Sequence, residues 1–176
     1  ADGRIECSLA DLHQLDPRDR NRRKPMESEA NLFASQLLMP PAKLKKAIGR
    51  LGVSLISLID MARDFDLSKE GVARAFVHSH REPAAIIVSR YGRAQRFYRH
   101  EDFPYLPIRN GKALPPEAIA SDALAPGSIF EIEDVEPDIW LTERGVDRLL
   151  ALSEQALGQS SGYALTLLQA ELDDEA

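Results

Sequence analysis

The 176-residue sequence has one cysteine, few aromatic residues and no long apolar run. The single cysteine, Cys7, excludes an internal disulfide framework and fits a reducing compartment. No apolar stretch approaches the length needed to cross a bilayer, and no charged-then-apolar leader stands at the N-terminus. We therefore expect a cytoplasmic protein without membrane association, built as one ordinary domain or two small ones.

An excess of basic residues is also lacking. The formal net charge is −6, which argues against a large nucleic-acid footprint. One basic segment, residues 18–24, contains four arginines and a lysine. We interpret this segment as a solvated surface loop, and the alternative interpretation is a contact for an acidic partner or for nucleic acid.

Paired histidines at metal-binding spacing are lacking as well. The four histidines are His13, His78, His80 and His100, and none has a second histidine four residues away with a glutamate between them. His78 and His80 are two residues apart, so on a helix they point to nearly opposite sides and cannot bind one ion. We interpret these two as surface residues at a helix end.

The most informative stretch is residues 26–40, M-E-S-E-A-N-L-F-A-S-Q-L-L-M-P. Its apolar residues recur at helical spacing, which predicts an amphipathic helix. Pro40 ends that helix because it lacks a backbone N–H. Glu27 and Asn31 stand one turn apart at the edge of the apolar face. Polar groups beside such packing need a partner, and a metal ion would be one.

These residues resemble the glutamate signature of the ImmA/IrrE-type zinc metallopeptidases. In that family a glutamate, an Ala-Asn or Ala-Asp pair, Phe-Ala and a Leu-Leu-Met-Pro-like ending follow an H-E-x-x-H helix whose two histidines bind zinc. The resemblance implies that Glu27 is the third zinc ligand and that Asn31 hydrogen-bonds a ligand side chain from one turn away. Glu29 is the weaker candidate, since it lies over Phe33 rather than over Asn31.

The resemblance further implies a peptidase that cleaves a helix-turn-helix transcriptional repressor in a stress response. Zinc would polarise a water, the glutamate of H-E-x-x-H would take its proton, and the water would attack the scissile carbonyl. Residues 1–176 contain no H-E-x-x-H, and a catalytic zinc needs three protein ligands, so we expect these residues alone to be inactive. The alternative is a non-catalytic regulatory module that binds a ligand or a partner on the same scaffold.

The sequence predicts an α+β protein in two parts. Residues 1–80 are predicted to be mostly helical, and the resemblance assigns them to part of a zincin-like peptidase domain. Residues 81–176 are predicted to contain two hairpins, one pairing 84–89 with 94–98 and the other pairing 149–157 with 163–172. By the resemblance this second part is a GAF-like domain, a fold often used to sense a small molecule or a protein partner.

The segment between the two hairpins has a less regular pattern. It predicts a short helix over 117–124, a strand over 128–132 and a further strand over 138–141. Residues 149–152 could instead extend a helix that begins near Glu143. We assign the aromatic residues of this part to the core, with the lining of a pocket as the alternative: Tyr98, Phe103, Tyr105 and Trp140.

Two helices of the first part have the outline of a helix-turn-helix DNA reader. Ser54 and Ser68 are their predicted N-caps. The second helix offers only Lys69, Glu70 and Arg74 at the positions that would read bases, within an acidic chain. We therefore favour a packing role for this helix over direct DNA binding.

Overall fold

The computed structural model describes residues 39–79 and 83–173. The chain divides into two units, Ala1–Pro40 and Pro41–Ala176, and nearly all of the described residues belong to the second. In that unit three helices pack on one antiparallel sheet, so the chain is α+β as predicted. The predicted domain boundary near residue 80 falls outside the described residues and stays a prediction.

The three helices are α2 (Pro41–Leu51), α3 (Leu55–Asp64) and α4 (Lys69–Ser79). At the start of α3, the hydroxyl of Ser54 accepts a hydrogen bond from the Ser57 N–H at 3.1 Å. At the start of α4, the hydroxyl of Ser68 accepts one from the Gly71 N–H at 3.1 Å. Both predicted N-caps are thereby confirmed. None of the helices in the described part of the chain is long and apolar enough to cross a bilayer.

The sheet has five antiparallel strands in the order β2-β1-β5-β4-β3. They are β1 (Ala84–Arg90), β2 (Arg93–Arg99), β3 (Glu133–Asp134), β4 (Leu149–Gly158) and β5 (Tyr163–Leu172). The pairs β1–β2 and β4–β5 are the two predicted hairpins, which are confirmed. The β1–β2 turn contains Tyr91 and Gly92 at φ of 48° and 67°, as a tight hairpin turn requires.

The segment between the hairpins differs from its prediction. The helix predicted over 117–124 is a single 3-10 turn, η1 (Ile119–Ser121). The strand predicted over 138–141 is wrong, because Pro137 cannot donate to a ladder and instead begins a 3-10 helix, η2 (Pro137–Ile139). A short helix, α5 (Glu143–Val146), ends before β4, so residues 149–152 belong to the strand.

The strand predicted over 128–132 is confirmed only in outline. This segment runs along β4, where Ile129 forms an isolated bridge with Leu157 and the Phe130 N–H donates to the Ala156 carbonyl at 2.9 Å. On this side of β4, away from β5, regular pairing is confined to β3. The outer edge of the sheet is therefore an irregular extended segment.

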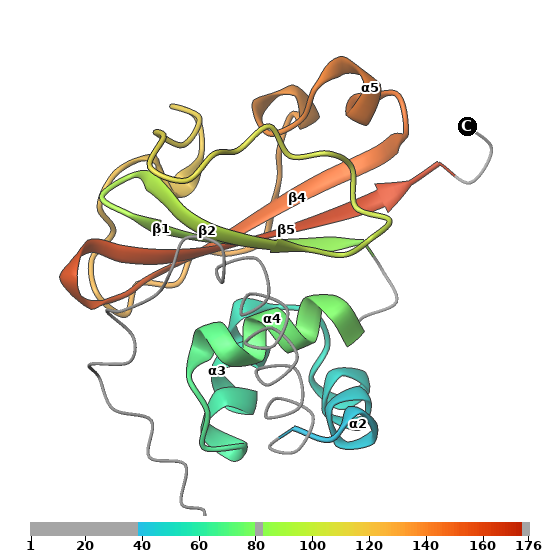
Figure 1. Cartoon of the computed structure of the whole chain (residues 1–176), viewed down its shortest axis with the longest axis vertical. Helices are drawn as coiled ribbons and strands as arrows, with labels where there is room; N and C mark the ends of the chain where they lie inside the picture. Colours follow the sequence, from blue (N-terminus) through green and yellow to red (C-terminus); the bar gives the residue numbers. More distant parts are fainter. Residues whose placement is uncertain (1–38, 80–82, 174–176) are drawn as a thin grey trace, which may run out of the picture. The chain divides into compact units, whose positions relative to one another are not determined.

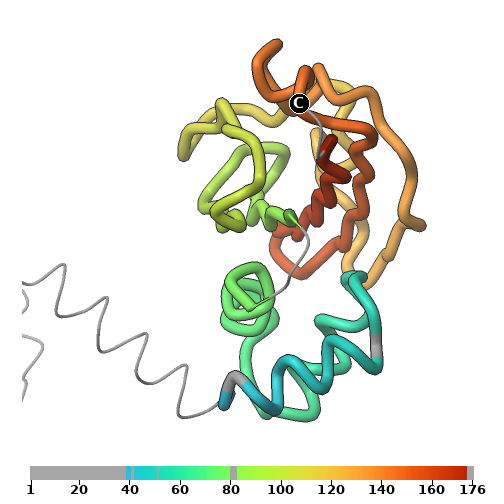
Figure 2. Tube along the Cα trace, turned by 90° about the vertical axis from the view of Figure 1, so that its right-hand side faces the viewer, coloured from blue at the N-terminus to red at the C-terminus, as the bar shows by residue number. Residues whose placement is uncertain are grey.

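The two faces of the sheet are covered by different kinds of structure (Figure 1). Helices α2, α3 and α4 lie on one side, here called the helical face. Most of the segment from 100 to 148 lies on the other, here called the loop face, as Figure 2 shows from a second direction, while its residues 129–134 run along the edge at β4. Neighbouring residues of a strand point to opposite faces, so Ile86 faces the helices and Ile87 the loops, and both are fully buried.

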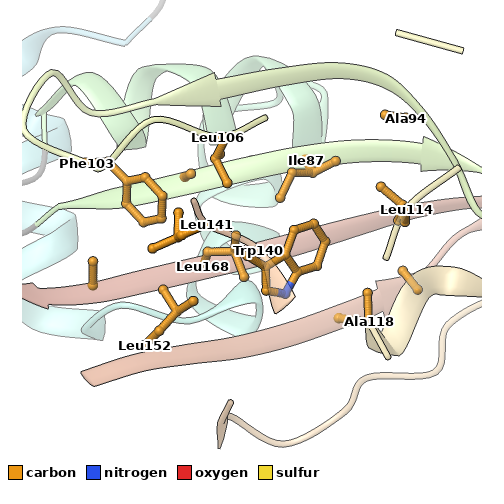
Figure 3. Packing of buried hydrophobic residues seen from close by; sticks show 14 of the residues in the cluster. Ile87, Ala94, Phe103, Leu106, Leu114, Ala118, Trp140, Leu141, Leu152 and Leu168 are labelled. Atoms are coloured by element: carbon orange, nitrogen blue, oxygen red, sulfur yellow. The ribbon is translucent and has the colours of Figure 1, made fainter. Parts of the chain in front are cut away.

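The core of the loop face is built around Trp140, whose exposed fraction is 1%. Figure 3 shows its indole ring among side chains from the strands and from the irregular segment. The larger members of this cluster are Ile87, Phe103, Leu106, Leu114, Leu141, Leu152 and Leu168. The prediction that Phe103 and Trp140 are core residues is confirmed, whereas Tyr105 is exposed.

The helical face is joined to the helices by side-chain hydrogen bonds as well as by packing. The Gln155 Oε1 atom accepts from the Leu55 N–H at 2.7 Å, at the first turn of α3. The Gln169 Nε2 atom donates to the Val53 carbonyl at 3.1 Å. These bonds satisfy backbone groups at the α3 end that the helix itself cannot pair.

Helix α4 packs against the sheet through buried residues, namely Val72, Ala73, Phe76 and Val77. At its first turn, Glu70 accepts a hydrogen bond from the Tyr98 hydroxyl at 2.7 Å and forms an ion pair with Arg96 at 2.9 Å. The packing role favoured for this helix is confirmed. That the chain does not bind DNA directly stays a prediction.

Candidate ligand-binding site

The predicted zinc ligand Glu27 and its neighbour Asn31 lie outside the described residues. Over residues 39–79 and 83–173, no group of three or more His, Cys, Asp or Glu side chains could hold a metal ion. The zinc site therefore stays a prediction. Of the predicted surface histidines, His78 is exposed in the last turn of α4, and His80 is not described.

A buried carboxylate ties two parts of the irregular segment to β4. Glu154, with an exposed fraction of 1%, lies on the loop face of the strand. Its Oε2 atom accepts a hydrogen bond from the Trp140 Nε1–H at 2.8 Å, and its Oε1 atom accepts one from the Ile119 N–H at 3.0 Å. Each carboxylate oxygen thus has a donor, as burial requires. Glu154 thereby fixes the indole ring and η1 over the strand.

The environment of Glu154 changes its acidity. Burial raises its pKa above the ordinary value for a glutamate, because desolvation disfavours the charged form. The N–H donors of Trp140 and Ile119 oppose this effect by stabilising the carboxylate, while the charge of Glu133 adds to it. Among the described residues no cationic side chain forms an ion pair with Glu154. The carboxyl group is therefore held in the core by neutral donors.

A pocket of about 300 Å³ opens beside Trp140 on the loop face, here called the Trp140 pocket. Its lining is Pro107, Ile108, Arg109, Lys112, Ala113, Leu114, Pro115, Ile139 and Trp140. Most of these side chains are apolar, and its volume is at the small end of the range for ligand pockets. The residues come from two stretches of the irregular segment, 107–115 and 139–140.

Backbone hydrogen bonds hold the walls of the Trp140 pocket in place. The Leu114 N–H donates to the Gly92 carbonyl at 2.8 Å, and the Ala94 N–H donates to the Lys112 carbonyl at 2.9 Å. These two bonds fasten the wall to the turn and outer edge of β2. The opposite wall is fixed by Trp140, whose backbone N–H donates to the Pro137 carbonyl at 3.2 Å. The pocket therefore rests on ordered strands.

A second pocket, of about 510 Å³, lies on the helical side between the start of α4 and the β4–β5 turn. It is here called the Glu70 pocket, after a lining residue whose carboxylate pairs with Arg96. Tyr98 donates to the same carboxylate; burial raises its pKa, and the bond to Glu70 adds to that effect. Two of its charged lining residues, Glu70 and Arg96, thus pair with each other, while Lys69 forms no ion pair with a described carboxylate.

Two buried hydroxyls on the loop face have no hydrogen-bond partner among the described residues. They are the Ser89 Oγ and Thr166 Oγ1 atoms, on β1 and β5. Thr166 is paired across the sheet with Ile87 and with Ala156. The loop face thus buries polar atoms with hydrogen-bond partners, in the Glu154 carboxylate, and polar atoms without a described partner, in the Ser89 and Thr166 hydroxyls.

Sequence reasoning missed Glu154 and the two cations of the Trp140 pocket. A signal for Glu154 exists: Leu152, Glu154 and Ala156 share one face of a predicted strand, so a carboxylate stands between two apolar residues. No comparable signal exists for Arg109 and Lys112, since their segment has no regular period. The prediction named Trp140 only as a residue of the core or of a pocket lining.

A comparison with protein-family models finds no match to the chain, and a comparison with curated proteins likewise finds none. The functional argument therefore rests on the signature in residues 26–40 and on the geometry described above.

Proposed function

We propose that the chain is a portion of an ImmA/IrrE-type zinc metallopeptidase that cleaves a helix-turn-helix repressor in a stress response. The observation that carries the proposal is the sequence of residues 26–40, where Glu27 and Asn31 are four residues apart before Phe-Ala and a Leu-Leu-Met-Pro ending. The antiparallel sheet formed by strands between residues 84 and 172 is compatible with the GAF-like domain that the resemblance implies for residues 81–176.

In this proposal Glu27 supplies one carboxylate ligand to the metal, and Asn31 fixes a ligand side chain by a hydrogen bond. The remaining ligands would come from an H-E-x-x-H helix, which residues 1–176 do not contain. Zinc, when bound, supplies a Lewis acid that polarises a water and the scissile carbonyl. The residues fit this role by type, since carboxylate oxygen is a common zinc ligand in catalytic sites.

The test uses a full-length protein that contains an H-E-x-x-H segment upstream of Ala1. We expect it to bind zinc and to cleave its repressor, and we expect Glu27→Ala to lose both properties. Asn31→Ala should lower zinc affinity or activity by about 10- to 100-fold. Glu29→Ala is the matched control, because it removes a neighbouring carboxylate that is the weaker candidate ligand. Full zinc content in the Glu27→Ala protein would exclude the assigned ligand.

The Trp140 pocket favours a second candidate function, a regulatory module that binds a small ligand. It has an apolar lining of the kind that ligand pockets share, and it is built on the sheet. A ligand-binding module without zinc chemistry would bind its ligand but show no zinc-dependent cleavage. Measuring both properties on one full-length preparation therefore separates the two candidates.

A further inference from the structure

We propose that the Trp140 pocket binds a small organic anion, an apolar body that carries one carboxylate. This inference concerns the described residues alone and goes beyond the proposed peptidase function, because it requires neither zinc nor a repressor. It rests on three properties of the pocket: its apolar inner wall, the sign of the charges that line it and the rigidity of its frame.

The inner wall of the pocket selects an apolar body. Trp140 and Leu114 are almost completely buried, so the pocket reaches the core of the loop face. Ile108 and Ile139 add partly buried aliphatic surface beside them. The apolar surface that still meets water in this recess therefore comes mainly from partly buried residues such as Ile108 and Ile139, and an apolar ligand would remove it from water.

The charged side chains of the pocket select the sign of the ligand. Arg109 and Lys112 are its only charged lining residues, and both are cationic and exposed. Neither forms an ion pair with any described carboxylate. A guanidinium and an ammonium beside an apolar recess favour a carboxylate, which can accept charged hydrogen bonds from both.

The frame of the pocket is ordered without a ligand. The Lys112 N–H donates to the Arg109 carbonyl at 3.1 Å, so the two cationic residues belong to one turn. The indole N–H of Trp140 is bonded to buried Glu154, which fixes the ring that forms the inner wall. A ligand therefore has little ordering of the backbone to induce, and this lowers the free-energy cost of binding.

The Glu70 pocket is the weaker candidate for the same ligand. It is larger and also contains Lys69, but its carboxylate, Glu70, pairs with Arg96 and would repel an incoming anion. The Trp140 pocket has no acidic lining residue among those described. The difference in charge therefore assigns the anion to the loop face.

The test uses the fluorescence of Trp140, which is the only tryptophan of the chain. We expect titration with 4-phenylbutyrate to change the fluorescence saturably. The neutral amide of the same acid should bind about tenfold more weakly or worse, because it cannot form the charged hydrogen bonds. Isothermal titration calorimetry should give the same ranking of the two compounds.

The matched variants separate the pocket from general electrostatics. Arg109→Gln/Lys112→Gln should lower the affinity for the acid to that for the amide, without changing the affinity for the amide. Lys45→Gln/Lys46→Gln removes the same charge from exposed positions of α2 and should bind like the wild type. Circular dichroism establishes that each variant folds.

Three results would overturn the proposal. Acid and amide could bind equally, octanoate and 4-phenylbutyrate could both fail to bind saturably up to millimolar concentration, or the α2 double variant could lose as much affinity as the pocket variant. None of these results affects the zinc proposal, whose test measures metal content and repressor cleavage. Loss of zinc binding likewise leaves the anion measurement unchanged.

Discussion

The helical and loop faces of the sheet bury the same strands in different ways. On the helical face, α3 and α4 satisfy most of their backbone groups internally, so the sheet adds packing and a few bonds at helix ends, such as that from Leu55 to Gln155. On the loop face the covering segment pairs its backbone mainly within short turns, such as Lys112 to Arg109 and Ser121 to Ala118, and other backbone groups need partners outside the segment. Glu154 supplies one of them by accepting from the Ile119 N–H.

This difference explains why the buried carboxylate of Glu154 and the Trp140 pocket lie on the loop face. An irregular cover brings polar partners such as Glu154 into the core and leaves a recess beside Trp140, because its turns do not fill space as helices do. Helices need fewer buried polar side chains as partners, because they pair most of their backbone groups internally. Function commonly resides in loops held on a rigid scaffold, and the sheet is that scaffold here.

The largest expected effect tests whether the loop face depends on its buried polar bonds as well as on packing. Phe76→Ala on the helical face and Trp140→Ala on the loop face should each destabilise by about 3–5 kcal/mol, because each removes a fully buried ring. Trp140→Ala should cost about 1–3 kcal/mol more, since it leaves the Glu154 Oε2 atom without its donor. Chemical denaturation followed by circular dichroism measures both, because Trp140→Ala removes the only tryptophan.

Trp140→Phe is the control for this pair. It retains most of the aromatic volume but removes the indole N–H, so its loss of stability should lie between wild type and Trp140→Ala. If Phe76→Ala costs as much as Trp140→Ala, the loop face is held by packing alone.

The second prediction concerns how tightly the chain packs around a glycine on the loop face and around one in the helices of the helical face. Gly92 has φ of 67°, and a Cβ atom there would overlap the carbonyl of Ser121, the last residue of η1. Gly92→Ala should therefore destabilise by about 1–3 kcal/mol from overpacking and by about 1–2 kcal/mol from backbone strain. Thermal unfolding measures the change.

Gly49→Ala is the matched substitution in the helices of the helical face. Gly49 is exposed within α2, and a Cβ atom there meets nothing within 4 Å. This variant should be more stable than wild type by about 0.5–1 kcal/mol, because alanine loses less backbone entropy in a helix. Opposite signs for the two substitutions support the comparison, and a tolerated Gly92→Ala would show that the loop cover is loosely held.

The third prediction uses pH to isolate the buried carboxylate. The pKa of Glu154 is raised in the folded state, so over the window between the unfolded and folded pKa values the native protein binds more protons than the unfolded chain. The contribution of Glu154 to stability therefore falls as pH rises through that window and is constant above it. Relative to Glu154→Gln, which does not titrate, wild type should lose stability with rising pH.

Denaturation of both proteins from about pH 4 to about pH 8 checks this prediction. Trp140→Phe should make the fall larger, because it removes an N–H donor that lowers the pKa of Glu154. A difference between wild type and Glu154→Gln that does not change with pH would mean that the carboxyl group is not desolvated.

The helical face could be predicted from the sequence far better than the loop face. Serine before an amphipathic run marked the starts of α3 and α4, and β-branched runs around Tyr91-Gly92 marked the first hairpin. These signals are local, so no knowledge of distant contacts was required. The buried residues of α4, among them Val72 and Phe76, recur at helical spacing, so their common face can also be recognised locally.

The loop face depends on contacts that no local pattern encodes. Arg109 and Trp140 are about thirty residues apart in the chain. They line the same pocket only because both of their segments are fastened to the sheet. A 3-10 helix that begins at Pro137 stands where a strand was predicted over 138–141. The apolar residues after Pro137 favoured the strand, but Pro137 favours the start of a helical turn. The alternation around Glu154 is a local signal for an inward carboxylate that the sequence analysis did not use, and no local pattern gives the partners of this carboxylate. The zinc residues Glu27 and Asn31 stay predictions.

The smallest expected effect concerns unpaired hydroxyls. Thr166→Val replaces a fully buried hydroxyl, which has no partner among the described residues, by a methyl group of similar shape. It should stabilise the protein by about 1 kcal/mol, because the desolvated hydroxyl is removed.

Ser57→Ala is the contrasting variant among the helices of the helical face. The Ser57 hydroxyl lies 2.9 Å from that of Ser54, so its loss should destabilise the protein by about 0.5–1.5 kcal/mol. Denaturation at one pH measures both, and a destabilising Thr166→Val would reveal a polar partner for this hydroxyl, such as a bound water. The loop face would then satisfy its buried polar atoms as fully as the helical face does, and the contrast between the faces would reduce to their shape.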